Sequence, residues 1–182
     1  DVERSRGLGD VYKRQFLAFI RDGRDEPVEE LVLPELIREV VAPYNQKSEQ
    51  VRLFLEAVPA FPLRRVSIKR LIVNLIENAL RYGGSPVEIV LSVAGDHSAP
   101  YVVLSVMDRG AGIDPNELSN IVNPFIRGDS ARGGKGAGLG LAIVKRIASL
   151  HGGSVELRNR TGGGLEARIC LPLGLLLPRD AA

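Results

Sequence analysis

The chain has 182 residues and a net charge of +2, with 45% hydrophobic and 25% charged residues. This composition is typical of one globular domain with a buried core, and so balanced a charge argues against a nucleic-acid or membrane surface. The single cysteine excludes an internal disulfide, and no apolar run approaches the roughly 20 residues that span a bilayer.

The two ends of the chain are expected to lie outside the folded domain. Residues 1–15 show no helical or strand periodicity and resemble translated vector sequence, so we predict a non-native or disordered leader. Residues 16–26 start with the apolar run FLAFIR, which predicts the end of a longer helix. The domain is then expected to span residues 27–172, and residues 173–182 to form a C-terminal tail.

The first half of the domain is predicted to alternate short strands with helices. In chain order, we expect a strand at Glu30–Leu33, a helix opening at Pro34, a strand at Val51–Leu55 and a loop between Pro59 and Pro62. The longest helix, SIKRLIVNLIENALRYGG, is predicted to be capped by Ser67 and terminated by Gly83.

The second half is predicted to contain two hairpins with helices between them. The elements are strands at Val87–Val93 and Tyr101–Met107, a short helix over Asn116–Ile121, an amphipathic helix from Leu141, and strands at Gly153–Arg158 and Leu165–Leu171. Three main helices and about five strands in this order indicate an α/β fold, a two-layer α/β sandwich.

A glycine-rich stretch, Gly133–Leu141, reads GGKGAGLGL and runs directly into the amphipathic helix. A glycine loop before a helix start presents backbone N–H groups at the positive end of the helix dipole, which suits a phosphate chain. A flexible linker between two domains explains the same composition equally well. This stretch alone does not decide between a phosphate loop and a linker.

Polar residues form a separate stripe along one edge of the longest helix. Asn74, Asn78 and Arg81 are spaced four and three residues apart, so they lie on one side of the helix. Asparagine is a poor helix former, and its amide oxygen is a hard, neutral ligand that suits Mg²⁺ when phosphates supply most of the other ligands. A solvated polar face is the plainer explanation of this helix taken alone.

The segment MDRGAGI, Met107–Ile113, places a carboxylate at the end of a predicted strand. Gly110 and Gly112 follow Asp108 and let the backbone turn close to a ligand. A carboxylate in this position can accept a hydrogen bond from the exocyclic amine of adenine. A bond of that kind contributes roughly 1.5–3 kcal/mol, which favours adenine over guanine by about tenfold to a hundredfold. The alternative is an ordinary turn closed by the Asp side chain.

The segment NPFIRGDSAR, Asn123–Arg132, precedes the glycine stretch. Arg127 and Arg132 are placed to approach phosphates, and Phe125 to wedge a mobile loop against the core. An ordinary surface loop with one buried aromatic side chain would have the same composition.

Together these stretches follow the order N-x-x-x-N-A-x-x-Y-G, D-x-G-x-G-I, N-P-F-x-R-G and G-x-G-L-G-L-A-I-V. In this order and spacing they resemble the ATP-binding catalytic domain of sensor histidine kinases, which shares its nucleotide fold with gyrase, Hsp90 and MutL. The runs RYG, FIRGDSAR and GLGLAIVKRI especially resemble EnvZ-type osmosensor kinases. The resemblance covers residues 16–172, and it implies a mixed five-stranded sheet under three helices with a mobile ATP lid.

The resemblance also implies which residues would hold Mg²⁺ and ATP. Asn78 would be the metal ligand, with Asn74 beside it toward the phosphates, and Asp108 would hold the adenine amine. The remaining nucleotide-binding residues would be Arg81, Tyr82, Gly110, Gly112, Ile113, Phe125, Arg127, Gly128, Gly136, Ala137, Gly138, Leu139, Gly140 and Leu141. Two positions depart from the family pattern, because Ala137 replaces a common Ser or Thr and Val122 replaces a common Phe.

One position of the longest helix separates kinases from ATPases in this family. The hydrolytic relatives place a water-activating Glu four residues before the metal Asn, where this chain has Asn74, which cannot accept a proton. Glu77 lies about 100° around the helix from Asn78 and is expected to face elsewhere. The resemblance therefore implies transfer of the γ-phosphate to a histidine. A degenerate nucleotide-binding docking module and, less favoured, a gyrase/Hsp90-type ATPase are the alternatives.

The phosphoacceptor histidine is expected to lie outside this chain. His97 falls in a predicted hairpin loop and His151 at a helix end, and neither has the H-E-x-x-x-P setting that the family uses. No catalytic residue is therefore assigned within the chain, and FLAFIR resembles the tail of the acceptor and dimerisation hairpin. The expected parent is a homodimeric inner-membrane sensor, of which this chain is a soluble, monomeric, cytoplasmic part. Its expected partners are that hairpin and a response-regulator receiver domain, not nucleic acid.

Overall fold

The computed structural model describes residues 25–96, 98–118 and 140–174. Its centre is a five-stranded sheet with the strand order β2 (Val51–Leu55), β4 (Val87–Ala94), β5 (Tyr101–Met107), β7 (Leu165–Pro172) and β6 (Ser154–Asn159). β2 pairs with β4 in parallel, whereas the other three pairings are antiparallel. The predicted mixed sheet and both predicted hairpins are confirmed.

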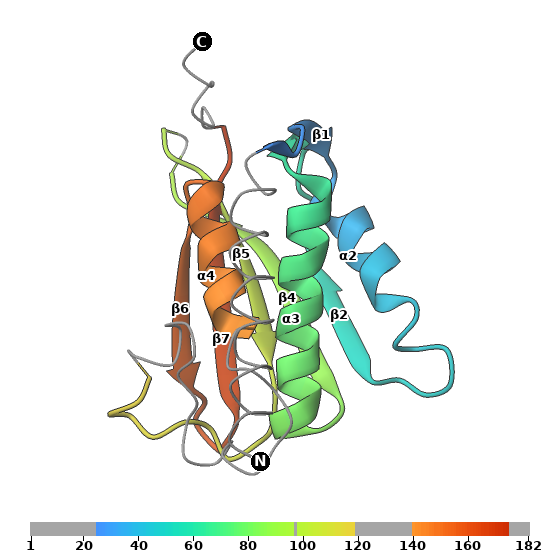
Figure 1. The fold of residues 1–182 in the computed structure, drawn as a ribbon, viewed down its shortest axis with the longest axis vertical. Coiled ribbons are helices and arrows are strands. Elements are labelled where there is room, and N and C mark those ends of the chain that lie inside the picture. The colour runs from blue at the N-terminus through green and yellow to red at the C-terminus, as the bar shows by residue number, and fades with distance from the viewer. Residues whose placement is uncertain (1–24, 97, 119–139, 175–182) are drawn as a thin grey trace, which may run out of the picture.

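Three helices cover one face of this sheet (Figure 1), namely α2 (Leu33–Val41), α3 (Arg65–Gly83) and α4 (Gly140–Leu150). A two-stranded antiparallel ribbon of β1 (Glu29–Leu31) and β3 (Phe61–Leu63) lies beside the N-terminal end of α3. Across the described part of the chain this is the predicted two-layer α/β sandwich.

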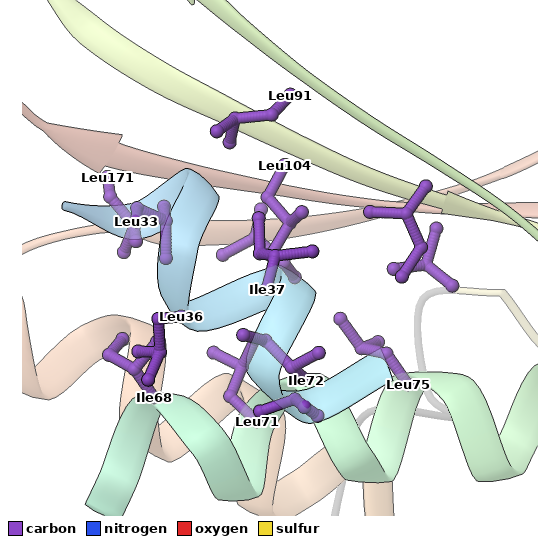
Figure 2. Close-up of a cluster of buried hydrophobic side chains, with 14 of the residues drawn as sticks. Leu33, Leu36, Ile37, Ile68, Leu71, Ile72, Leu75, Leu91, Leu104 and Leu171 are labelled. Atoms are coloured by element: carbon purple, nitrogen blue, oxygen red, sulfur yellow. The ribbon is translucent and has the colours of Figure 1, made fainter. Parts of the chain in front are cut away.

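The hydrophobic core fills the space between the sheet and the helices (Figure 2). Leu33 and Ile37 from α2, Leu71 from α3 and Leu104 from β5 are almost completely buried there. Burying one such side chain stabilises the fold by about 1.5–3 kcal/mol. The core therefore fixes the positions of α2 and α3 on the sheet.

Apolar residues at helical spacing orient α3. The buried side of the helix consists of Ile68, Leu71, Ile72, Leu75, Ile76 and Ala79. Asn74 and Asn78 are half-buried at the edge of this stripe. Because the apolar stripe faces the sheet, the helix rotation that buries it also carries the two asparagines toward α4.

The first turn of α3 is capped from a distant part of the chain. The carboxylate of Glu26 accepts hydrogen bonds from the backbone N–H of Val66 and from both the backbone N–H (3.0 Å) and the hydroxyl (2.6 Å) of Ser67. The N-cap is Arg64, and Ser67 lies inside the first turn. The prediction of Ser67 as the cap is wrong, because the capping group comes from another segment.

The predicted loop between Pro59 and Pro62 is also wrong, because Phe61–Leu63 forms β3. Pro62 faces Glu30 across the ribbon. Both strands of a two-stranded ribbon are edge strands, where the missing N–H of a proline is tolerated. On the other side of the ribbon, β1 ends at Leu31, two residues earlier than predicted.

The short helix predicted over Asn116–Ile121 is a turn at residues 115–118. The Asp114 carboxylate accepts a hydrogen bond from the N–H of Asn116 (2.8 Å), which closes an Asx turn. Residues 119–121 lie outside the described part of the chain.

The predictions for the chain ends fall mostly on residues 1–24 and 175–182, which lie outside the described part. The leader, the acceptor-helix end and the tail therefore stay predictions. Of the helices that are described, none is both long enough and apolar enough to cross a membrane.

Candidate functional site

The glycine at the start of α4 brings α4 against the asparagine stripe of α3. A Cβ at Gly140 would lie 3.1 Å from Nδ2 of Asn78, 3.4 Å from its Oδ1 and 3.3 Å from Oδ1 of Asn74. The Asn74 amide donates to the Arg70 carbonyl (2.8 Å), which fixes the direction of its side chain. Two amide groups are thus placed beside the N-terminal end of a helix, where partial positive charge favours an anion.

Asp108 stands directly after β5, as predicted, and is 6% exposed. Its Oδ1 accepts hydrogen bonds from the N–H groups of Gly110 (2.8 Å) and Leu165 (3.1 Å). No hydrogen bond from the described residues reaches its other oxygen, Oδ2. One carboxylate oxygen therefore holds the turn, and the other remains an acceptor for a ligand.

The Asp108 turn packs against the C-terminal end of α3. A Cβ at Gly83 would lie 2.3 Å from Cβ of Asp108, and a Cβ at Gly110 would lie 2.5 Å from the carbonyl oxygen of Tyr82. Glycine is needed at both positions because any side chain would displace one backbone from the other. This close approach places Asp108 beside the helix that carries Asn78.

The other predicted site residues of the described chain lie near the Asn78–Gly140 contact or the Asp108 turn. Arg81 and Tyr82 are exposed at the end of α3, with Tyr82 47% exposed. Gly112 has a φ of 76°, a backbone conformation that favours glycine, and it lies next to half-buried Ile113. Leu141 packs its side chain against the core at the start of α4.

Seven of the seventeen predicted nucleotide-binding residues lie outside the described residues and are not placed. These predictions are Phe125, Arg127, Gly128, Gly136, Ala137, Gly138 and Leu139, together with Arg132, Val122 and the mobile lid over Gly133–Ala137.

Glu77 is exposed on α3, one residue before Asn78. Burial raises the pKa of Tyr44, and the nearby negative charge of Glu77 raises it further. Tyr44 follows the end of α2, so the Glu77 carboxylate lies near that residue. Its direction relative to Asn78 stays a prediction from the helical spacing.

His151 is 4% exposed and both of its ring nitrogens are engaged. Nε2 accepts a hydrogen bond from the N–H of Arg64 (3.0 Å), and Nδ1 donates to the carbonyl of Ile147 (2.8 Å). Burial lowers the pKa of this imidazole because it disfavours the charged form. His151 joins α4 to the start of α3, and neither nitrogen is open to a phosphoryl group. His97 lies outside the described residues.

Sequence reasoning missed two residues of the β6–β7 turn that hold the Asp108 segment. Asn159 bonds the backbone of Ile113, and Arg160 donates to the carbonyl of Asp108 (2.6 Å). The sequence marks both only as parts of a turn between two strands. No local signal shows that they contact residues about 50 positions earlier.

The site includes no metal-binding cluster of carboxylates, histidines or cysteines within the described ranges. Asn78 offers a single neutral oxygen next to the start of α4. Such a donor fits Mg²⁺ only when a bound polyphosphate supplies most of the other ligands. The residues present fit a metal that arrives together with a nucleotide.

Comparison with known families decides the class of the domain. Residues 64–175 match the family model of histidine kinase-, DNA gyrase B- and HSP90-like ATPases. The chain belongs to this family. The match spans α3, the Asp108 turn, α4 and the second hairpin, so the fold and the family predicted from the motifs are confirmed.

The proteins that the chain resembles within this family include sensor histidine kinases. The chain is 38% identical over 151 residues to the sensor histidine kinase GtrS of Pseudomonas aeruginosa, covering 82% of this chain and 30% of that protein. It therefore spans less than a third of GtrS. The histidine kinase domain of the E. coli osmosensor EnvZ is 32% identical with a TM-score of 0.63, covering 86% of this chain and 95% of that domain.

A further solved structure, the catalytic domain of histidine kinase ThkA, is 27% identical with a TM-score of 0.66. This similarity covers 81% of the chain and 98% of that domain. EnvZ is thus one structural neighbour among several sensor kinases in the ATPase family, and its likeness to this chain is not a special one.

Proposed function

We propose that the chain is the ATP-binding catalytic domain of a two-component sensor histidine kinase. It transfers the γ-phosphate of Mg-ATP to a histidine on an acceptor helix of the parent protein, for relay to a response-regulator aspartate. The observation that carries this proposal is that Asn78 of α3 lies against the start of α4, while Asp108 packs on the C-terminal end of α3. Adenine at Asp108 and phosphates at Gly140 would then lie along the C-terminal half of α3.

Each end of the nucleotide has its own group in this proposal. Oδ2 of Asp108 accepts a hydrogen bond from the adenine amine, and the N-terminal end of α4 faces the phosphates. Asn78 would hold Mg²⁺, which would supply positive charge to neutralise the developing charge on the phosphates. Catalysis then comes from positioning the γ-phosphate and from charge neutralisation.

Transfer to a protein acceptor is favoured over hydrolysis. Asn74 stands where a water-activating carboxylate would be needed, and its amide is held by the Arg70 carbonyl. The Glu77 carboxylate lies near enough to Tyr44 to raise the pKa of its phenol. Because Asn74 cannot take a proton from water, transfer to a protein nucleophile is favoured over hydrolysis.

The parent protein is proposed to be a dimeric inner-membrane sensor. GtrS is a sensor histidine kinase, and the chain spans only 30% of it. The acceptor hairpin and a response-regulator receiver domain are its proposed partners.

The testing experiment has two steps. The full chain is first titrated with ATP in the presence and absence of Mg²⁺. A separately made acceptor hairpin is then added with labelled ATP, and phosphohistidine is measured on the hairpin. We expect Mg-dependent binding followed by transfer; absence of ATP binding contradicts the proposal.

Asn78→Ala tests the metal position directly. It should weaken ATP binding by roughly tenfold with Mg²⁺, the equivalent of about 1.4 kcal/mol, and change it little without the metal. Asn116→Ala is the matched control, because the Asn116 side chain bonds Asp114 in an exposed turn. Equal losses with and without Mg²⁺ would remove Asn78 from the metal site.

A second candidate is a nucleotide-binding docking module without turnover. The substitution of Ala137 for a hydroxyl-bearing residue favours it, since a hydrogen-bond donor to the phosphates is lost. ATP binding without any transfer to an acceptor hairpin would select this function.

A further inference from the structure

We propose that Asn159 and Arg160, at the β6–β7 turn, are positioning residues for recognition of the base. They hold the Asp108–Ile113 segment in the shape that presents Oδ2 of Asp108 to an adenine amine. This inference rests on the proposed ATP-binding function. It adds two residues, distant in sequence from all the predicted motifs, to the base side of the site.

Asn159 holds the far end of the segment with both polar atoms of its amide. Oδ1 accepts a hydrogen bond from the N–H of Ile113 (2.9 Å), and Nδ2 donates to the Ile113 carbonyl (2.6 Å). A side chain that satisfies both backbone groups of one residue replaces a strand partner for that residue. The segment is therefore fixed at Ile113 although it belongs to no sheet.

Arg160 holds the near end of the segment. Its guanidinium donates to the backbone carbonyl of Asp108 (2.6 Å) and also reaches Glu88 (3.3 Å). Glu88 is only partly exposed and binds Arg109, the residue after Asp108, through its other oxygen (3.0 Å). The Asp108–Arg109 peptide is thus held by Glu88 at the start of β4 and by Arg160 at the start of the β6–β7 turn.

The same turn approaches the segment too closely for ordinary side chains. A Cβ at Gly112 would lie 2.6 Å from Oδ1 of Asn159, and a Cβ at Gly164 would lie 2.1 Å from the carbonyl oxygen of Asp108. Both glycines have positive φ values, 76° and 100°. The β6–β7 turn therefore contacts the Asp108–Ile113 segment at several positions and not at one alone.

The chemistry of Asn159 indicates a role in positioning and not in folding. Asn159 is exposed, and its side-chain amide makes hydrogen bonds to the Asp108–Ile113 segment and not to its own hairpin. The hairpin is closed independently by the N–H of Arg160 bonding the Gly164 carbonyl (2.9 Å). Removing the Asn159 amide should leave β6 and β7 paired, while the Asp108–Ile113 segment becomes more flexible.

The consequence for Asp108 follows from its hydrogen bonds. Oδ1 is held by Gly110 and Leu165, so the direction of Oδ2 depends on the backbone between Asp108 and Gly110. If Ile113 is released, that backbone gains freedom and the acceptor is presented in many directions. Selectivity for adenine should fall more than affinity for the shared phosphates.

The test measures ATP and GTP binding to the full chain and to Asn159→Ala, with Mg²⁺ present. Adenine offers an amine where guanine has a carbonyl, so the ratio of the two affinities reports on the Asp108 acceptor. We expect ATP affinity to fall by about five- to tenfold, the effect of two exposed hydrogen bonds, with GTP affinity changed less than about twofold. Asn116→Ala, in the exposed turn that follows the Asp108–Ile113 segment, should leave the ratio unchanged.

Amide hydrogen exchange without nucleotide adds an independent measurement. The Ile113 amide should exchange faster in Asn159→Ala, while amides of β5 and β7 keep their protection. Arg160→Lys, which keeps the charge but loses the fork of donors, should lower the ATP-to-GTP ratio in the same direction.

The outcomes separate this inference from the function it rests on. If the unaltered chain binds ATP and Asn159→Ala keeps the same ATP-to-GTP ratio, the inference is overturned alone, even when Ile113 exchanges faster. Equal losses of ATP and GTP affinity also overturn it, because they indicate general damage. If the unaltered chain binds no ATP, the proposed function fails and the inference fails with it.

Discussion

The two ends of α3 use polar groups for opposite purposes. At the N-terminal end, the Glu26 carboxylate satisfies backbone N–H groups of the first turn, and both nitrogens of His151 are bonded. At the C-terminal end, Oδ2 of Asp108 has no partner among the described residues, and the Asn78 amide lies against the bare backbone of Gly140. The first arrangement stabilises the fold, and the second has hydrogen-bonding capacity left for a ligand.

This difference teaches how to separate structural from functional polar groups in one helix. Buried polar groups are normally satisfied within the protein, because an unmade hydrogen bond costs about 1–3 kcal/mol. The Glu26 and His151 groups are satisfied and need no ligand, although Nε of Arg64 beside them is buried with no hydrogen-bond partner among the described residues. Oδ2 of Asp108 is not a fully buried unpartnered atom, so water can bond it until a ligand takes its place. Changes at the two ends should therefore have separable effects.

The largest effect is expected for Asp108→Asn at the C-terminal end. Its Oδ1 can still accept from Gly110 and Leu165, but an amide NH₂ would face the adenine amine in place of Oδ2. ATP affinity should fall by about tenfold to a hundredfold, measured by calorimetry, with the unfolding midpoint in urea little changed. Asp114→Asn is the control, and a parallel loss of stability in Asp108→Asn would contradict the comparison.

Glu26→Ala is the corresponding change at the N-terminal end. It removes the acceptor for the N–H groups of Val66 and Ser67, so the free energy of unfolding should fall by about 1–2 kcal/mol. ATP affinity should stay within about twofold. Glu30→Ala on β1 serves as the matched exposed carboxylate, and a large affinity loss in Glu26→Ala would show that the two ends are coupled.

Gly140→Ala should change stability and binding in opposite directions. Alanine is the better helix residue by up to about 1 kcal/mol, so stability should rise slightly. Its Cβ, however, would press on Asn74 and Asn78 at 3.1–3.4 Å, and ATP affinity should fall by roughly threefold. Ser149→Ala on the same helix is the control; improved stability with unchanged affinity would place the ligand away from this junction.

The smallest effect is a pH dependence of stability from His151. Burial lowers its folded pKa, with Arg64 adding to the shift and Glu26 opposing it, so below the ordinary value of 6.5 the unfolded chain binds a proton that the folded chain does not. This part of the stability is complete above about pH 6.5 and is lost as the pH falls below it. The free energy of unfolding in urea, measured between pH 7.5 and 5, should depend less on pH in His151→Gln than in the unaltered chain.

Most of the sheet and the polar stripe of α3 could be predicted because their signals are local. The four-residue spacing of Asn74 and Asn78 sets them on one side of a helix, and Asp108 follows a clear β-branched run. The cap of α3 could not be predicted, because Glu26 is 41 residues away from Ser67. Local rules chose Ser67 for its residue type, and tertiary contact overrode that choice.

The β6–β7 turn shows the same limit on the functional side. Asn159 is typical of a hairpin turn, and nothing near it indicates the Ile113 backbone 46 positions earlier. The pairing of β5 with β7 brings the two together, since Met107 lies opposite Glu166 in the register. A residue of this kind can be found only once the strand order is known.

The hydrogen bonds of the Asp108–Ile113 segment also set an order of events in folding. Those to the β6–β7 hairpin span 46 to 57 positions, from Ile113 to Asn159 and from Asp108 to Leu165, whereas the β4–β5 hairpin is built from nearer contacts. Contacts between distant residues form late because long loops must close first. We expect the segment to acquire its shape only after the last hairpin has docked, so pulse-labelling during refolding should find the Leu165 and Ile113 amides protected later than the amides that pair β4 with β5.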